Sequence, residues 1–199
     1  SVAQPGKPAA AAGSDAATDG KSNDLPSINL TANLLYRIMT AEVAQQRGDS
    51  AAAVTSYQLL ARQTRDPRMA RRATEIALGA RLTTQAVDCV RLWTELEPRS
   101  ADAAQALAAL LVASGQLQEA RPLLEAQLKA ASDPVDELVR LQRSLARNAG
   151  PEAFALFDAL ATPYLKDARR AADVHLLLAA TASSAGLTER AIREARTAT

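Results

Sequence analysis

Few side chains in this sequence could do chemistry. The chain has one histidine, His175, and one cysteine, Cys89. Nucleophilic catalysis needs a serine or cysteine within reach of a base, and a metal site needs several clustered His, Cys or carboxylate ligands. No such spacing occurs, because the acidic residues are scattered along predicted helices. We therefore expect His175 and Cys89 to be packing residues, and we expect no enzyme activity, metal or cofactor.

One short stretch looks like part of a nucleotide site. Gly20-Lys21-Ser22 matches the end of a phosphate-binding P-loop. That motif needs another glycine five positions before Gly20, where the chain has Asp15, and it must follow a β-strand. No strand is predicted here, so the sequence does not support a nucleotide site.

The densest charge is a run of five arginines. Such a cluster could meet an acidic partner or phosphate, but we favour a solvated rim whose carbon stems cover neighbouring residues. The formal net charge is only +1 and few aromatic residues lie between the arginines, so we do not expect nucleic-acid binding. The five residues are Arg62, Arg65, Arg68, Arg71 and Arg72.

The elements that carry these side chains are predicted helix pairs. The stretch from Ser100 to Lys129 has leucines at helical spacing on both sides of a turn at Gly115. Small residues, Ala108 and Ala120, fall where the two helices must touch. Asp66-Pro67 and Asp133-Pro134 predict helix starts, with Asp as the N-cap and Pro at the first helical position.

The helix pair recurs along the chain. Alanines at the same place in each second helix lie 33, 34, 33 and 38 residues apart. The composition is 48% hydrophobic but only 3% aromatic, which suits closely spaced helices. A helix–turn–helix unit with a period near 34 is the signature of the tetratricopeptide repeat. The five alanines are Ala53, Ala86, Ala120, Ala153 and Ala191.

From about Leu30 onward the chain therefore resembles the tetratricopeptide repeat (TPR) family. Three of the five predicted turns carry the family's glycine, at Gly48, Gly115 and Gly186, and the second and fourth lack it. Pro98 matches the proline that closes a repeat. The resemblance implies an all-α fold, a right-handed α-solenoid of antiparallel helix pairs with about five repeats.

Two segments are predicted. Residues 1–27 are rich in Ala, Gly, Ser, Asp and Pro, so we expect a flexible linker. Residues 28–199 are expected to form the solenoid. Solenoid ends normally carry a polar capping helix, so we expect this solenoid to be truncated at its C-terminal end; alternatively, the helix from about Thr188 is a short cap. No run approaches the roughly 18 apolar residues of a membrane span.

The predicted binding site is the concave face of the solenoid. In a right-handed stack of helix pairs the first helices line this face, which suits an extended peptide or a partner helix. A clamp for a C-terminal carboxylate, known in one variant of the family, is not expected, because Ile38, Glu42 and Asp102 hold its positions. The outward residues are Leu35, Ile38, Glu42, Gln45, Arg68, Arg71, Glu75, Asp102, Gln105, Val112, Gln142 and Asp173.

The first two helix pairs carry a more particular resemblance. The runs LLYRIMTAE, RGD and LARQTRDPRMARRATEIA resemble a family of proteobacterial TPR proteins exported to the periplasm, often as outer-membrane lipoproteins. That family includes adaptors that bind a carboxyl-terminal processing protease and present cell-wall hydrolases to it. The resemblance implies a periplasmic location with tethering to the outer membrane, and a periplasmic protease or its substrates as partner; the alternative location is the cytoplasm.

The function expected from the sequence is a non-catalytic scaffold or adaptor that binds a protein or peptide. The alternative is a docking or regulatory region of a larger enzyme whose catalytic domain lies outside these residues. Polysaccharide binding is disfavoured, because glycan grooves usually offer aromatic platforms and the few aromatic residues are scattered. The sequence predicts neither the partner's identity nor the oligomeric state.

Overall fold

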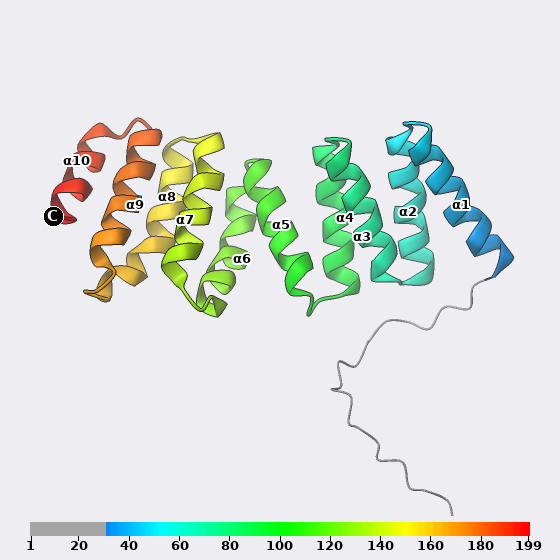
Figure 1. The fold of residues 1–199 in the computed structure, drawn as a ribbon, viewed down its shortest axis with the longest axis horizontal. Coiled ribbons are helices and arrows are strands. Elements are labelled where there is room, and N and C mark those ends of the chain that lie inside the picture. Colours follow the sequence, from blue (N-terminus) through cyan, green and yellow to red (C-terminus); the bar gives the residue numbers. More distant parts are fainter. Residues whose placement is uncertain (1–30) are drawn as a thin grey trace, which may run out of the picture.

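The computed structural model describes residues 31–199, which form ten α-helices and two short 3-10 helices (Figure 1). The predicted linker and the P-loop-like stretch lie outside the described residues. The elements are α1 (Ala32–Gln46), α2 (Ser50–Thr64), α3 (Pro67–Gly79), α4 (Thr83–Leu96), α5 (Ala101–Ala113), α6 (Leu117–Ala130), α7 (Pro134–Leu145), η1 (Ala146–Asn148), α8 (Pro151–Ala161), η2 (Thr162–Lys166), α9 (Ala171–Ser184) and α10 (Thr188–Thr197).

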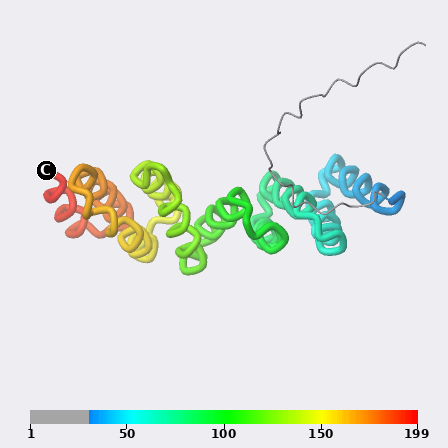
Figure 2. The backbone as a smooth tube through the Cα atoms, turned by 90° about the horizontal axis from the view of Figure 1, so that it is seen from below, coloured from blue at the N-terminus to red at the C-terminus, as the bar shows by residue number. Residues whose placement is uncertain are grey.

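The helices form a two-layered rod. Consecutive helices pair as α1/α2 through α9/α10, which we call the first to fifth pairs. In Figure 1 the odd-numbered helices α3, α5 and α7 lie in front of α4, α6 and α8. Figure 2 shows the chain running from one end of the rod to the other without turning back. Each pair thus contacts its neighbours in sequence, and the predicted α-solenoid is confirmed.

Small residues form the seams between helices. Ala41, Ala53, Ala86 and Ala120 are fully buried, so the backbones of neighbouring helices approach closely there. Large apolar side chains such as Phe157 fill the space around the seams, and one continuous core runs through the rod. Ala191, the last of the recurring alanines, is only partly buried.

Four of the five pairs close with the same three-residue turn. Its middle residue has a positive φ angle, and the residue after it donates its N–H to a carbonyl five positions earlier, as from Gln116 to Leu111 at 2.8 Å and from Leu82 to Ala77 at 2.8 Å. The second pair has this turn without a glycine. The middle residues are Gly48 (φ 83°), Arg81 (58°), Gly115 (76°) and Gly186 (75°).

The fourth pair is joined differently. Between α7 and α8 the chain forms the 3-10 helix η1 and then an extended step at Gly150, so that five residues, 146–150, replace the three of the other turns. Asn148 in η1 turns back to α5, where its side-chain Nδ2 donates to the carbonyl oxygen of Ala113 at 3.1 Å. α7 and α8 pack only lightly on each other, and α9 packs against both.

Two aspartates cap helices as predicted. The Asp66 Oδ1 accepts from the backbone N–H of Arg68 at the start of α3, and the Asp133 Oδ1 accepts from that of Val135 at the start of α7. Pro67 follows the first cap, where its missing N–H costs no hydrogen bond.

Ion pairs tie successive helix pairs together. Each joins an arginine to a carboxylate roughly one repeat away in sequence. Within residues 31–199, such pairs join the first pair to the second, the second to the third and the fourth to the fifth, but not the third to the fourth. They are Arg72–Glu42 (3.0 Å), Arg65–Glu95 (3.0 Å), Arg91–Glu119 (2.8 Å), Arg170–Asp133 (2.7 Å) and Arg190–Asp158 (3.1 Å).

Candidate protein-binding surface

Glu42 is held in a network that joins the first three helices. It points from α1 toward α2 and α3, where the Tyr57 hydroxyl donates to its Oε1 at 2.6 Å. Arg72 of α3 donates from Nε and Nη2 to the two carboxylate oxygens, each at 3.0 Å. The prediction placed Glu42 on an outward surface; the structure shows a half-buried side chain whose acceptors are already engaged.

The network keeps its charges at neutral pH. The Tyr57 hydroxyl and Arg72 hold the pKa of Glu42 below its usual value, against the effect of burial. Burial, together with the hydrogen bond to Glu42, raises the pKa of Tyr57 to about 12. A carboxylate, a neutral phenol and a guanidinium therefore face one another, which fixes α1 against α3.

Arg71 and Glu75 extend this network onto the exposed face of α3. The Arg71 Nε donates to the Glu75 Oε1 at 3.1 Å, and the Arg71 guanidinium lies 5.6 Å from the centre of the Trp93 ring. Arg72 approaches Glu75 from the other side, at 3.8 Å. Both Arg71 and Glu75 remain exposed, as predicted, yet their neighbours orient them.

Arg68 has a structural contact. Its guanidinium donates from Nε and Nη2 to the Asp66 Oδ2 at 2.9 and 2.7 Å, and Asp66 is fully buried as the cap of α3. Four of the five clustered arginines thus have carboxylate partners within the described part of the chain: Arg65, Arg68, Arg71 and Arg72. This pairing fits the predicted rim more closely than a free anion-binding patch.

The remaining predicted residues are scattered. Asp102 and Gln105 on α5 and Asp173 on α9 are exposed side chains on separate helices, while Gln45 on α1 is half-buried. Of the apolar residues predicted to line the concave face, Leu35 is exposed and Ile38 is half-buried.

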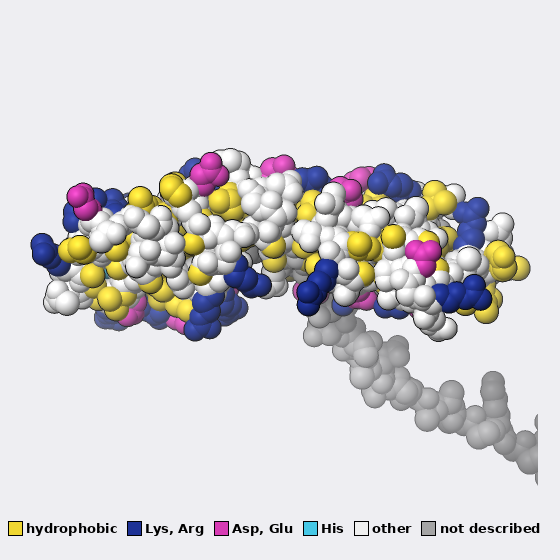
Figure 3. Space-filling model, turned by 90° about the horizontal axis from the view of Figure 1, so that it is seen from above, with side chains coloured by type: hydrophobic (Ala, Val, Ile, Leu, Met, Phe, Trp, Pro, Cys, Tyr) yellow, Lys and Arg dark blue, Asp and Glu magenta, His cyan; other side chains and the backbone are white. Residues whose placement is uncertain are grey.

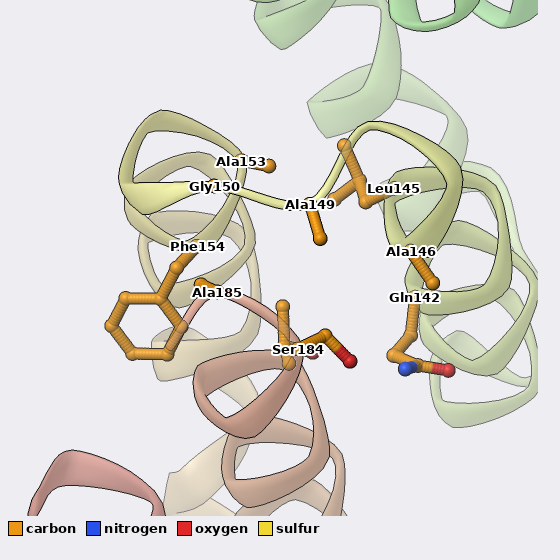
Figure 4. Close-up of a pocket in the computed structure, with 10 residues that line it drawn as sticks. Gln142, Leu145, Ala146, Ala149, Gly150, Ala153, Phe154, Ser184 and Ala185 are labelled. Carbon is orange, nitrogen blue, oxygen red and sulfur yellow. The ribbon is translucent and has the colours of Figure 1, made fainter. Parts of the chain in front are cut away.

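Two predicted positions face inward. Val112 was expected to point outward, which is wrong: it is buried in the core. It lies in the last turn of α5, and the Asn148 side chain from η1 contacts its carbonyl oxygen, so the fourth pair covers this turn. Gln142 is half-buried beside a small cavity between α7, α8 and α9, which has room for about one water molecule (Figure 4).

His175 and Cys89 lie on different helices. The His175 Nδ1 lies 2.6 Å from the Oε2 of Glu194, a buried residue of α10 that the sequence analysis did not single out. Arg190 also contacts Glu194, with 2.7 Å between its Nε and the Oε1; because that N–H is not aimed at the oxygen, the contact is ionic. His175 thus helps to hold α9 against α10.

Cys89 is a buried thiol on α4. The Gln58 Nε2 lies 3.1 Å from its sulfur. Burial raises the pKa of the Cys89 thiol to about 11, so it stays protonated at neutral pH. A protonated, buried thiol is a poor nucleophile, which agrees with a packing role.

The hollows of the surface are shallow grooves. One of about 320 Å³ lies between α1 and α2, and one of about 310 Å³ lies between α6 and the α8–η2 segment. Residues 31–199 contain no cluster of three or more His, Cys, Asp or Glu arranged to bind a metal ion. In the same residues no helix combines the length and apolar character needed to cross a membrane.

The rod of paired helices is an α-solenoid, and comparisons with known proteins support the TPR type. No protein-family model matches the chain. The chain is 30% identical over 119 residues to a TPR repeat-containing protein of Pseudomonas aeruginosa strain PAO1, a match that covers 60% of this chain and 20% of that protein. This chain thus spans about a fifth of the relative's length.

Two solved structures share the fold. MamA from Desulfovibrio magneticus RS-1, from residue 41 to its end, has a TM-score of 0.51 at 16% identity, covering 85% of this chain and 95% of that one. A crystal structure of MamA protein has a TM-score of 0.50 at 12% identity, covering 83% and 89%. At these identities the similarity is one of fold.

Proposed function

We propose that this protein is a non-catalytic scaffold that binds another protein along the exposed face of its odd-numbered helices. The observation that carries the proposal is that several odd-numbered helices of one continuous rod bear exposed polar side chains: Arg71 and Glu75 on α3, Gln105 on α5 and Asp173 on α9. Solenoids use such long surfaces to bind extended peptides or helices. The shallow grooves suit a protein partner better than an enclosed small molecule.

The ion-pair network supports this role. Because Arg71 is held by Glu75 and Trp93, it presents free N–H groups without losing much side-chain freedom on binding. Glu75 presents carboxylate oxygens beside it. Asp102 and Gln105 on the next odd-numbered helix add acceptors and an amide donor, so the surface suits a partner of mixed charge.

Site-specific photo-crosslinking tests the proposal. Benzoylphenylalanine is placed at Gln105 on α5 and, as a control, at Asp88 on α4; both side chains are exposed, but they lie in opposite layers. In extract from the source organism we expect discrete adducts from position 105 and none from position 88. Equal labelling at both positions, or none at either, would contradict binding on the odd-numbered helices.

We propose further that the protein works in the periplasm, tethered to the outer membrane, as an adaptor for a carboxyl-terminal processing protease. The support is the resemblance of the first two helix pairs to exported TPR proteins. Fractionation of cells that produce the natural protein tests the location. Recovery in the cytoplasm would refute it.

The adaptor role has its own assay. A cell-wall hydrolase is incubated with the protease, with and without the scaffold, and we expect faster cleavage when the scaffold is present. An unchanged rate would reject the protease as partner, while the crosslinking result at Gln105 would still stand.

A further inference from the structure

A groove of about 310 Å³ lies between α6 and the α8–η2 segment, at the junction of the third and fourth helix pairs. Both helices belong to the even-numbered layer, where they pack on each other behind α7 (Figure 1). Leu128 of α6 and Leu160 of α8 line the groove and are buried, so they form its floor. The groove is thus a surface separate from the odd-numbered helices of the proposed function.

No ion pair spans this groove within residues 31–199. Elsewhere in the same layer such a pair does join neighbouring helices, as between Arg91 of α4 and Glu119 of α6, at 2.8 Å. On the α6 wall of the groove the Arg121 Nε donates instead to Glu125 of the same helix, at 2.9 Å. The residues that line the groove from α8 and η2 are uncharged. The groove therefore stays open where other junctions of the layer are bridged.

The α6 wall has one positive charge without a partner. Arg121, Glu125 and Lys129 follow one another at intervals of four residues and all line the groove. The first two neutralise each other, whereas the exposed Lys129 makes no ion pair with another described residue. Lys129 also lies in the last turn of α6, where a cation favours the helix dipole. A ligand in the groove meets this ammonium group, which a carboxylate complements.

The charge of the groove is a local feature. Figure 3 shows Lys and Arg interspersed with Asp and Glu over the described residues of the face that it presents. No long-range field of one sign is therefore expected to select an acidic ligand. Selection depends on contact with Lys129 itself.

The opposite wall of the groove is apolar and aromatic. Pro163 is exposed and Tyr164 is half-buried, both in η2. The Tyr164 hydroxyl forms no hydrogen bond with another residue in the described part of the chain. A tyrosine in this setting packs its ring on an apolar side chain and donates its O–H to a nearby acceptor.

The dimensions favour an extended chain. From Arg121 to Lys129 the α6 wall is about 12 Å long at the helical rise per residue, which is the length of three to four residues of an extended chain. Over that length a helix about 10 Å across would fill roughly three times the volume of the groove. In an extended chain successive side chains point to opposite sides, so one side can face Tyr164 and the other Lys129.

We propose that this groove binds an extended acidic segment of a partner protein. An apolar side chain of the segment packs on Pro163 and Tyr164, and an Asp or Glu carboxylate of the segment pairs with Lys129. The bound segment then links α6 to the α8–η2 segment, in place of the ion pair found at neighbouring junctions.

Two synthetic peptides test the proposal. Each has about eight residues, enough to exceed the groove; one alternates leucine with glutamate, and its twin alternates leucine with lysine. Binding to the whole chain is measured by fluorescence anisotropy. We expect the glutamate peptide to bind and the lysine peptide to bind at least about tenfold more weakly. Equal affinities, or no binding of either peptide, would overturn the proposal.

Variants locate the site. Lys129→Glu and Tyr164→Ala are each expected to weaken binding of the glutamate peptide about tenfold or more. The control Arg193→Glu makes the same change of charge at an exposed residue of α10 and should leave binding unchanged. Circular dichroism checks that each variant is folded. An equal loss in Arg193→Glu would mean general attraction to positive charge and would overturn the proposal.

Two further outcomes would also reject it. If Lys129→Glu lowers the melting temperature but leaves peptide binding unchanged, Lys129 serves only the end of α6. If the chain pellets with vesicles of anionic phospholipid and Lys129→Glu abolishes the pelleting, the lysine binds a lipid headgroup rather than a peptide carboxylate.

Discussion

The second and fourth helix pairs both lack the glycine of the three-residue turn, and they connect their two helices in different ways. In the second pair Arg81 adopts the left-handed conformation itself, with φ 58°, and α3 and α4 pack closely. In the fourth pair the chain uses a longer connection through η1 and Gly150, and α7 and α8 pack only lightly. The comparison shows that tight helix packing can force a non-glycine residue into a strained turn, whereas a longer loop relaxes the turn and loosens the pair.

The Asp-Pro starts of these two pairs offer the sharpest test of the difference between them. α3 and α7 both begin with Asp-Pro, but Asp66 is fully buried whereas Asp133 is partly exposed. We expect Asp66→Ala to lower the free energy of unfolding by about 2–3 kcal/mol, because α3 loses its cap and the Arg68 guanidinium loses its buried carboxylate partner. Asp133→Ala should lower the free energy of unfolding by clearly less. Urea unfolding followed by circular dichroism measures both, and equal losses would show that the two pairs are held alike.

The turn itself can be probed with glycine. Gly115→Ala should cost about 1–2 kcal/mol, because φ 76° is strained for a side chain even though the added Cβ would meet no neighbour. Arg81→Gly should act in the opposite direction, raising the free energy of unfolding by up to about 1 kcal/mol.

Gly79 is a matched control for the turn glycines. It also has open space around its Cα, but it lies in α3 without a positive φ, so Gly79→Ala should be neutral or stabilising. A loss at Gly79 as large as that at Gly115 would show that the φ angle is not the cause.

Acid should weaken the first two pairs through Glu42. Its pKa in the folded state lies below the unfolded value, so its contribution is present above the unfolded pKa and is lost as the pH falls through the folded pKa. We expect Glu42→Gln to lower stability at neutral pH and to flatten the fall in stability between about pH 5 and pH 3. Thermal unfolding across that range, with the exposed Glu189→Gln as control, checks this. An unchanged pH profile in Glu42→Gln would contradict it.

The smallest effect is expected at Asn148. Its side chain reaches the last carbonyls of α5, which helps to dock η1 against the third pair. Asn148→Ala should lower the free energy of unfolding by about 0.5–1 kcal/mol, as for other partly exposed hydrogen bonds. Hydrogen exchange should quicken at the turn after α7 while the turn at Arg81 stays unchanged. Faster exchange at both turns would mean that the two pairs are not independent.

The sequence predicts the helices well because their signals are local. The Asp-Pro starts and the turn glycines each depend on a few adjacent residues, and the alanine period repeats one short pattern along the chain. All three mark helix pairs in the structure. The wrong orientation of Val112 has a different origin. Its position on α5 was predicted, but whether that side faces solvent depends on how the fourth pair, with its longer connection, packs against α5.

The candidate surface was harder to predict for a related reason. Glu42 pairs with Tyr57 and Arg72, which are 15 and 30 residues away. One signal could have found the second contact: several arginines have a carboxylate about one repeat away, as in Arg65 with Glu95. A search for opposite charges about one repeat apart would have identified Glu42 as a partner of Arg72 in an ion pair.

The ion pairs between successive helix pairs have a mechanical consequence. Within residues 31–199 they connect every junction except that between the third and fourth pairs, which is held by the packing of α7 and α8 on α5 and α6 and by the Asn148 hydrogen bonds to α5. This junction divides the rod into two blocks, α1–α6 and α7–α10, whose interiors contain all of these ion pairs. Added salt should soften the interiors of the blocks more than the joint between them.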